Sequence, residues 1–236
     1  MDFLQTFRTI AVIGLVPILL ITTSVQLVVN FTGFYSFEFE RSRIAEYTGI
    51  DNQELLRISG LIQDYFYNEN ELLIIPSKIN GRSVENIFNE KEVHHMKDVK
   101  ELFKGVFFLQ SASLIILSLL IASQIFFHRT KGLFSIMNNL VWGAYSTLFI
   151  ILLVSLAVLL SFDRIFHLFH VLSFANDFWM LNPRYDYLVA IFNQQFFFHA
   201  CLLVGIFSLS GAFLLIACKY FLNYFMKRTR IVTDEN

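Results

Sequence analysis

The stretch "IAVIGLVPILLITTSVQLVV", residues 10–29, decides the fold because it contains no Asp, Glu, Lys or Arg. A helix of about 20 predominantly apolar residues is long enough to cross the hydrocarbon core of a bilayer. The alternative is a signal peptide, but the apolar stretch is long and no small-x-small cleavage site stands out after it. We therefore predict an uncleaved transmembrane helix over residues 8–32, with a bend at Pro17.

Three more stretches without acidic or basic residues follow along the chain, and each is long enough to span a bilayer. Their expected membrane helices cover residues 105–128, 138–161 and 196–220. The composition agrees, because 16% of the residues are charged, against about 25% in soluble domains. The net charge of −1 gives no sign of nucleic-acid binding, so we expect no nucleic-acid partner.

The distribution of Lys and Arg predicts the orientation in the membrane, since cytoplasmic loops carry an excess of both. Three regions should share the cytoplasmic face: the amino terminus, a loop over residues 129–137 and a tail over residues 221–236. The basic residues in or beside these regions are Arg8, Arg129, Lys131, Lys219, Lys227, Arg228 and Arg230. Both termini are then cytoplasmic, and residues 33–104 and 162–195 are extracytoplasmic.

The first extracytoplasmic region, residues 33–104, is predicted to fold. Asp51 and Asn89 each stand three residues before a Glu, which is the spacing of a helix capping box. Between them, "ELLIIPSKINGRSV", residues 71–84, is typical of two strands joined by a turn at its Asn-Gly pair. We therefore expect an all-α membrane protein with four transmembrane helices and a small mixed α/β extracytoplasmic region.

The helix that Asn89 caps would carry "KEVHHMKDVKELF", residues 91–103, into the second membrane helix. Asp98 lies one turn from both His94 and His95, so its carboxylate can accept a hydrogen bond from either imidazole. Adjacent helical positions point about 100° apart, so only one of the two histidines can share a face with the rest of a site. The alternative is a solvated, charged helix beside the membrane.

The second extracytoplasmic segment contains "FDRIFHLFHVLSFANDFWMLNPRYDYLVAIF", residues 162–192, and mixes aromatic with polar residues. A re-entrant or surface-lying amphipathic segment would explain the aromatic residues. It explains the charged and amide residues and the histidines at 167 and 170 less well, because polar groups at membrane depth are costly unless they are paired or used. We expect both polar clusters to converge, with His95 close to His170.

A pair of histidines suits acid–base chemistry. Imidazole titrates near pH ~6.5, so one ring can accept a proton while the other, protonated, donates one. No G-x-S-x-G, H-E-x-x-H or P-loop motif occurs in the sequence, so nothing indicates a nucleophile elbow, a zincin-like protease or nucleotide use. Two alternatives stay open. One is a non-catalytic membrane sensor or assembly partner, and the other is a metal-dependent lipid-modifying enzyme with ligands from His94 or His95, Asp98, His167 and His170.

The two quoted stretches resemble the bacterial lipoprotein intramolecular transacylase (Lit) family, and the resemblance spans nearly the whole chain. The residues that match its H-x-x-D-V-K, F-H-x-x-x-F and N-D-x-W-x-x-x-P elements are His95, Asp98, Val99 and Lys100, then Phe169, His170 and Phe174, then Asn176, Asp177, Trp179 and Pro183. His94 and His167 are additional histidines beside the matching ones. Asn193 stands near a position where the family often has a proline.

The resemblance implies an acyltransferase that moves the sn-2 acyl chain of a lipoprotein's diacylglyceryl-cysteine to the α-amine of the same cysteine. It implies a diacylated lipoprotein and membrane lipid as partners, a monomer, no cofactor and no metal. The protein would lie in a bacterial cell membrane, with its active site on the extracytoplasmic side.

We expect His95, oriented by Asp98, to act as the general base and His170 to act as the proton donor. The two roles can be exchanged, and a covalent acyl-histidine is the alternative route. The residues expected to bind the substrate or its lipid headgroup are Asn176, Asp177, Trp179, Lys100 and Arg164.

Overall fold

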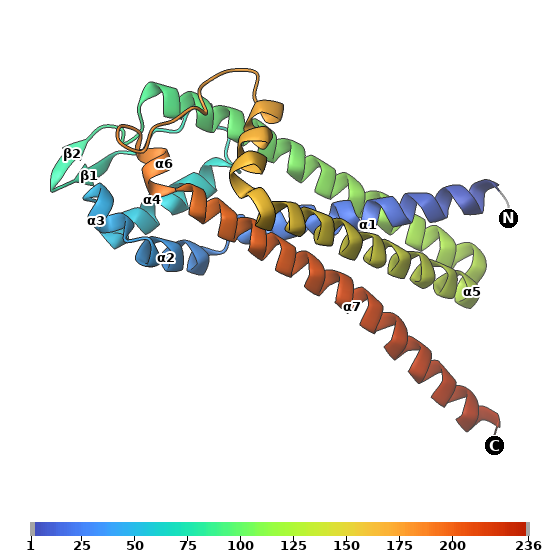
Figure 1. The fold of residues 1–236 in the computed structure, drawn as a ribbon. Helices are drawn as coiled ribbons and strands as arrows, with labels where there is room; N and C mark the ends of the chain where they lie inside the picture. The colour runs from blue at the N-terminus through green and yellow to red at the C-terminus, as the bar shows by residue number, and fades with distance from the viewer. Residues whose placement is uncertain (1–2, 235–236) are drawn as a thin grey trace. The chain divides into compact units, whose positions relative to one another are not determined.

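The computed structural model describes residues 3–234, and Figure 1 shows their helices and strands. The chain divides into two compact units, each described below by itself. The first contains the residues up to Ser24, Phe108–Leu156 and the residues from Val204 onward. The second contains Val25–Phe107 and Ala157–Leu203.

Four helices are long and apolar enough to cross a membrane. They are α1, Phe3–Val29, the two arms of α5, Glu90–Ser173, and α7, Gln194–Asp234. The arms of α5 are Glu90–Arg129 and Lys131–Ser173. This confirms the predicted fold class, an all-α membrane protein with four membrane helices and a small mixed region.

The chain reverses its direction within α5. Leu117 and Ile136 belong to one buried cluster, whereas positions so spaced on a straight helix would be about 28 Å apart. Arg129 takes the left-handed conformation, with a φ of 47°. Gly132 has no Cβ, and one placed there would lie 2.1 Å from the carbonyl oxygen of Gln124. The expected loop over 129–137 is therefore a tight helical hairpin.

The tail expected over residues 221–236 is helical as far as Asp234. Residues 235–236 lie outside the described part of the chain, and so do the side chains of Lys227, Arg228 and Arg230.

The first unit is held together by apolar packing and by small residues. Val12, Val16, Leu117 and Ile136 form its buried cluster. A Cβ at Gly143 would lie 2.6 Å from the Cβ of Val16. Small residues at such contacts let helix backbones approach closely, which is how helices associate in membranes.

The second unit contains the shorter elements. These are α2, Thr32–Arg41, α3, Ile44–Thr48, α4, Asn52–Tyr65, β1, Ser77–Ile79, β2, Arg82–Val84, and α6, Tyr187–Ile191. Strands β1 and β2 pair antiparallel with Lys78 opposite Ser83. Asn80 and Gly81 both have positive φ, 50° and 77°, as a two-residue hairpin turn requires. The strand begins only after Pro76, which has no N–H for a ladder.

Both expected helix caps are present. The side chain of Asp51 accepts a hydrogen bond from the backbone N–H of Glu54 at 2.9 Å. Glu54 also pairs with Arg57, and that hydrogen bond lowers the pKa of the Glu54 carboxyl to about 2. Asn89 and Glu92 form a complete capping box, which satisfies backbone N–H groups at the start of α5. The helix therefore begins at Glu90, and this sets the direction of the side chains that follow.

Candidate active site

The structure places His95 and His170 side by side within the second unit. Their ring centroids are 6.0 Å apart, and both side chains are buried. His95 lies near the beginning of α5 and His170 near its end, so the reversal of α5 is what allows them to meet. Two imidazoles this close together can both reach one reacting group of a substrate.

Their neighbours in sequence point elsewhere. The ring of His94 stacks on Phe178 at 5.1 Å, and its side chain is 41% exposed. The ring of His167 meets the edge of Trp179 at 5.3 Å and is exposed. His95 and His170 are therefore the two histidines that lie buried beside each other.

The backbone sets the orientation of His170. Its Nδ1 lies 2.7 Å from the carbonyl oxygen of Phe166. A carbonyl oxygen can only accept, so Nδ1 carries the hydrogen and donates it. In the neutral ring, Nε2 then has a free lone pair. By contrast, Nδ1 of His95 is buried without a hydrogen-bond partner in the part of the chain that the structure describes.

Asp98 does not orient His95 by a hydrogen bond, contrary to expectation. Its Oδ2 accepts a hydrogen bond from the side-chain amide of Asn176 at 2.8 Å. The amide oxygen of Asn176 accepts in turn from the backbone N–H of Phe178 at 3.0 Å. The carboxylate thus fixes the segment that follows α5, residues 174–186, which we call the 174–186 loop.

Aromatic rings of the 174–186 loop enclose the histidine pair. The Phe174 ring lies 5.2 Å from His95 and 5.7 Å from His170. The Trp179 ring lies 5.2 Å from His170. Asp177, expected beside them, is exposed, and its backbone carbonyl accepts from the N–H of Met180. Asp177 therefore shapes the turn of the loop.

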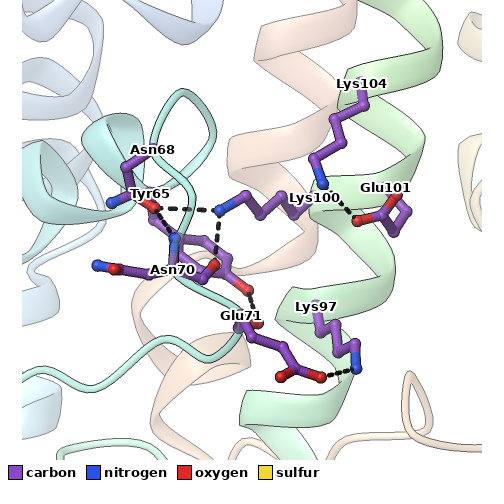
Figure 2. A network of polar contacts seen from close by, with 8 residues as sticks. All are labelled: Tyr65, Asn68, Asn70, Glu71, Lys97, Lys100, Glu101 and Lys104. Carbon is purple, nitrogen blue, oxygen red and sulfur yellow. Dashed lines mark hydrogen bonds and ion pairs between the residues drawn. The ribbon is translucent and has the colours of Figure 1, made fainter.

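Lys100 points toward the loop after α4, as Figure 2 shows. Its ammonium group is buried and donates to the carbonyl of Asn70 at 2.7 Å and to the side chain of Asn68 at 3.1 Å. It also lies 4.1 Å from the ring centroid of Tyr65. The expectation that Lys100 meets a lipid phosphate is not supported, because its donors hold the loop after α4.

Arg164 is exposed on the second arm of α5. Together with Asp163, His167, Leu168 and Val171 it lines an open groove on one face of that helix. Within residues 3–234 its guanidinium takes part in no hydrogen bond or ion pair. His167 contacts Trp179 and Trp179 contacts His170, so the groove adjoins the histidine pair.

Some polar residues of the second unit were not anticipated in these roles. Glu92 was expected only as a helix cap, yet its carboxylate also accepts from the backbone N–H of Leu188 at 2.5 Å. Glu38 on α2 is 2% exposed and lies 2.9 Å from Nδ1 of His199 on α7. A histidine inside an apolar run was the only sequence signal for this second pair. Among the described residues, no group of three or more His, Cys, Asp or Glu side chains is arranged to hold a metal.

The fold and the site together define a class: a multi-pass helical membrane protein with a buried pair of histidines in its second unit. The model of one protein family, described as lipoprotein intramolecular transacylase Lit, matches residues 10–197. The chain therefore belongs to the lipoprotein intramolecular transacylase family and is an acyltransferase of the membrane. No curated protein matches the chain.

Solved structures share the fold. The membrane-integral lipoprotein intramolecular transacylase Lit from Bacillus cereus superposes with a TM-score of 0.78 at 19% identity, covering 98% of this chain and 100% of that one. Its variant with a histidine-to-arginine substitution gives 0.75 over 97% and 95% of the two chains, also at 19% identity. A histidine-to-alanine variant gives 0.74 over 97% and 96% at the same identity.

Proposed function

We propose that the chain moves the sn-2 acyl chain of a diacylglyceryl lipoprotein to the α-amine of the cysteine that carries it. The observation that carries the proposal is the buried pair formed by His95 and His170, with ring centroids 6.0 Å apart. Donor ester and acceptor amine belong to one substrate molecule. Holding them together makes the reaction unimolecular, which can supply about 7–11 kcal/mol of the barrier.

The reaction balances without a cofactor. One imidazole takes a proton from the α-ammonium group, and the free amine attacks the carbonyl carbon of the sn-2 ester. A C–N bond forms, and the attacking nitrogen gives a second proton to an imidazole. The ester C–O bond breaks, the leaving sn-2 oxygen takes one proton from an imidazolium, and the remaining proton passes to solvent. The products are an amide and a hydroxyl group, so the protein needs only to position the groups and to move protons.

The geometry favours His170 as the base, which exchanges the roles first expected. Its Nδ1 hydrogen is held by the carbonyl of Phe166, so Nε2 of the neutral ring is left as an acceptor. His95 has no such restraint on Nδ1, and the N–H of its neutral ring can donate to the ester oxygens. Burial lowers the pKa of His95 to about 4 and also lowers the pKa of His170. Two neutral rings are therefore the favoured state of the free pair, and an imidazolium forms when one ring takes a proton from the substrate.

The remaining residues would bind the substrate or shape its pocket. Trp179 encloses the glyceryl region beside His170. Arg164 is exposed at the groove that adjoins the pair, where it can meet the polar part of the substrate or a lipid phosphate. Asn176 acts through its bond to Asp98 and keeps the 174–186 loop in place.

Product analysis tests the proposal. Purified protein is incubated with a synthetic diacylglyceryl lipopeptide, and the position of the acyl chain is read by mass spectrometry. We expect N-acylation with the wild type and a loss of about 100-fold or more in His95→Ala and in His170→Ala, the scale of general acid–base catalysis. His94→Ala is the matched control and should retain activity. Full migration in both single variants would exclude the pair.

The same assay separates direct transfer from a covalent route. If an imidazole attacks the ester first, an acylated protein accumulates when the lipopeptide amine is blocked by acetylation. Direct transfer leaves the protein unmodified under these conditions, which intact-protein mass spectrometry detects. The proposal above is for direct transfer, because the two rings are placed to move protons to and from groups of the substrate.

A further inference from the structure

The 174–186 loop and α6 are tied to the beginning of α5 by a set of polar contacts. Glu92 is at their centre, with its side chain 1% exposed. One carboxylate oxygen accepts from the backbone N–H of Asn89 at 2.7 Å, and the other accepts from the backbone N–H of Leu188 at 2.5 Å. The same carboxylate thus caps the beginning of α5 and accepts a hydrogen bond from the first turn of α6.

Two neighbours of Glu92 reinforce this link. The side-chain amide of Asn89 donates to Asp186 at 2.7 Å. The ammonium group of Lys91 donates to the backbone carbonyl of Met180. Both contacts join the first turn of α5 to the 174–186 loop.

The 174–186 loop, which these contacts hold, carries Trp179, and the ring of Trp179 contacts His170. Trp179 lies between Asn176, which Asp98 holds, and α6, which Glu92 holds. Its ring lies 5.2 Å from the ring of His170 and covers that side of the histidine pair. His95 stands one turn after Glu92 on α5. The Glu92 carboxylate therefore connects the helix that carries His95 with α6, which follows the 174–186 loop.

We propose that Glu92 is a positioning residue for the acyl transfer, which holds the 174–186 loop over His95 and His170. The proposal rests on the proposed function. Glu92 touches no substrate, and a buried carboxylate that accepts two backbone N–H groups cannot be replaced without leaving a donor unpaired. In Glu92→Gln one of the two backbone N–H groups faces an amide NH₂, which cannot accept its hydrogen bond. One of the two hydrogen bonds that join α5 to its cap and to α6 is therefore lost.

Fluorescence tests the position of the loop without any reaction. Trp142 is replaced by phenylalanine, which leaves Trp179 as the single tryptophan of the chain. We expect Glu92→Gln to make Trp179 more accessible to acrylamide quenching. Glu90→Gln is the matched control, since Glu90 stands in the same helical turn with 93% of its side chain exposed, and it should leave quenching unchanged.

Kinetics test whether that position matters for catalysis. We expect kcat of Glu92→Gln to fall by about 10- to 100-fold, as misplacement of a catalytic pocket by about 1 Å does, with little change in KM. Lys91→Met removes the exposed hydrogen bond from Lys91 to the carbonyl of Met180, so it should not unfold the protein. We expect it to increase quenching and to lower kcat, each by less than Glu92→Gln does.

The outcomes are distinct. Unchanged quenching in both Glu92→Gln and Lys91→Met would overturn the positioning role. Increased quenching with wild-type kcat would overturn it as well, because the loop would then not matter to the reaction. A wild-type protein without turnover would overturn the proposed function instead, while quenching would still show whether Glu92 holds the loop.

Discussion

Asn176 is hydrogen-bonded at both ends of its amide, to Asp98 through nitrogen and to the backbone of Phe178 through oxygen. Neither contact reaches a histidine, yet both determine where the loop rings lie. At the scale of single residues, hydrogen bonds among the surrounding side chains and the loop backbone therefore position the site. His95 and His170 are buried within this frame.

Replacement of Asn176 tests that frame. Asn176→Ala removes one hydrogen bond to a carboxylate, worth about 1.5–3 kcal/mol, and we expect turnover to fall by about tenfold. Asn176→Asp sets a second carboxylate against Asp98, and like charges repel, so its turnover should be lower still. Rates with the synthetic lipopeptide measure both variants. An Asn176→Asp enzyme as active as the wild type would contradict this account.

At the scale of elements, α5 is the part that builds the site. Its first arm carries Glu92, His95 and Asp98, and its second arm carries Phe166 and His170. A helix alone cannot bring such distant positions together, so the reversal at Arg129 and Gly132 is a condition for the pocket. The contact between α1 and the second arm of α5 supports the same hairpin within the first unit.

Gly143 tests that contact. A Cβ there would lie 2.6 Å from the Cβ of Val16, and overpacking of this kind costs about 1–3 kcal/mol. We expect Gly143→Ala to lower the thermal unfolding midpoint in detergent. Gly14→Ala on α1 is the control, because no atom lies within 4 Å of the added Cβ and alanine favours the helix. Equal midpoints for the two variants would show that the packing is looser than described.

At the scale of the whole molecule, the distribution of basic residues predicts the two sides of the membrane. Residues 33–104 and 162–195 together supply the histidine pair, and both are poor in Lys and Arg relative to Asp and Glu. We propose that the site faces the extracytoplasmic side, where a lipoprotein anchored in the outer leaflet can reach it.

Cysteine labelling tests this orientation. Cys201 and Cys218 are first replaced by alanine, and a single cysteine is placed at an exposed position in each region. Intact cells treated with a membrane-impermeant maleimide should label Glu85→Cys and should leave Lys131→Cys unlabelled until they are lysed. The reverse pattern would place the histidine pair on the cytoplasmic side and overturn the proposed location.

The sequence was informative wherever the cause is local. The length of the apolar stretches predicts the four long helices, and the caps at Asp51 and Asn89 predict where α4 and α5 begin. The Asn-Gly pair predicts the hairpin between β1 and β2. The pairing of His95 with His170 was expected from their positions at the ends of membrane helices on the same predicted side.

Only the tertiary structure decided which partner each polar side chain takes. From helical spacing alone, Asp98 could serve His94 or His95, but the fold brings Asn176 to it. Lys100 was expected to bind a lipid headgroup, but its ammonium group donates to the loop after α4 instead. Glu92 was predicted as a cap, and its bond to Leu188 was not. Helical and turn preferences act between neighbours in the chain, whereas a hydrogen bond needs two atoms about 3 Å apart, wherever they lie in the sequence.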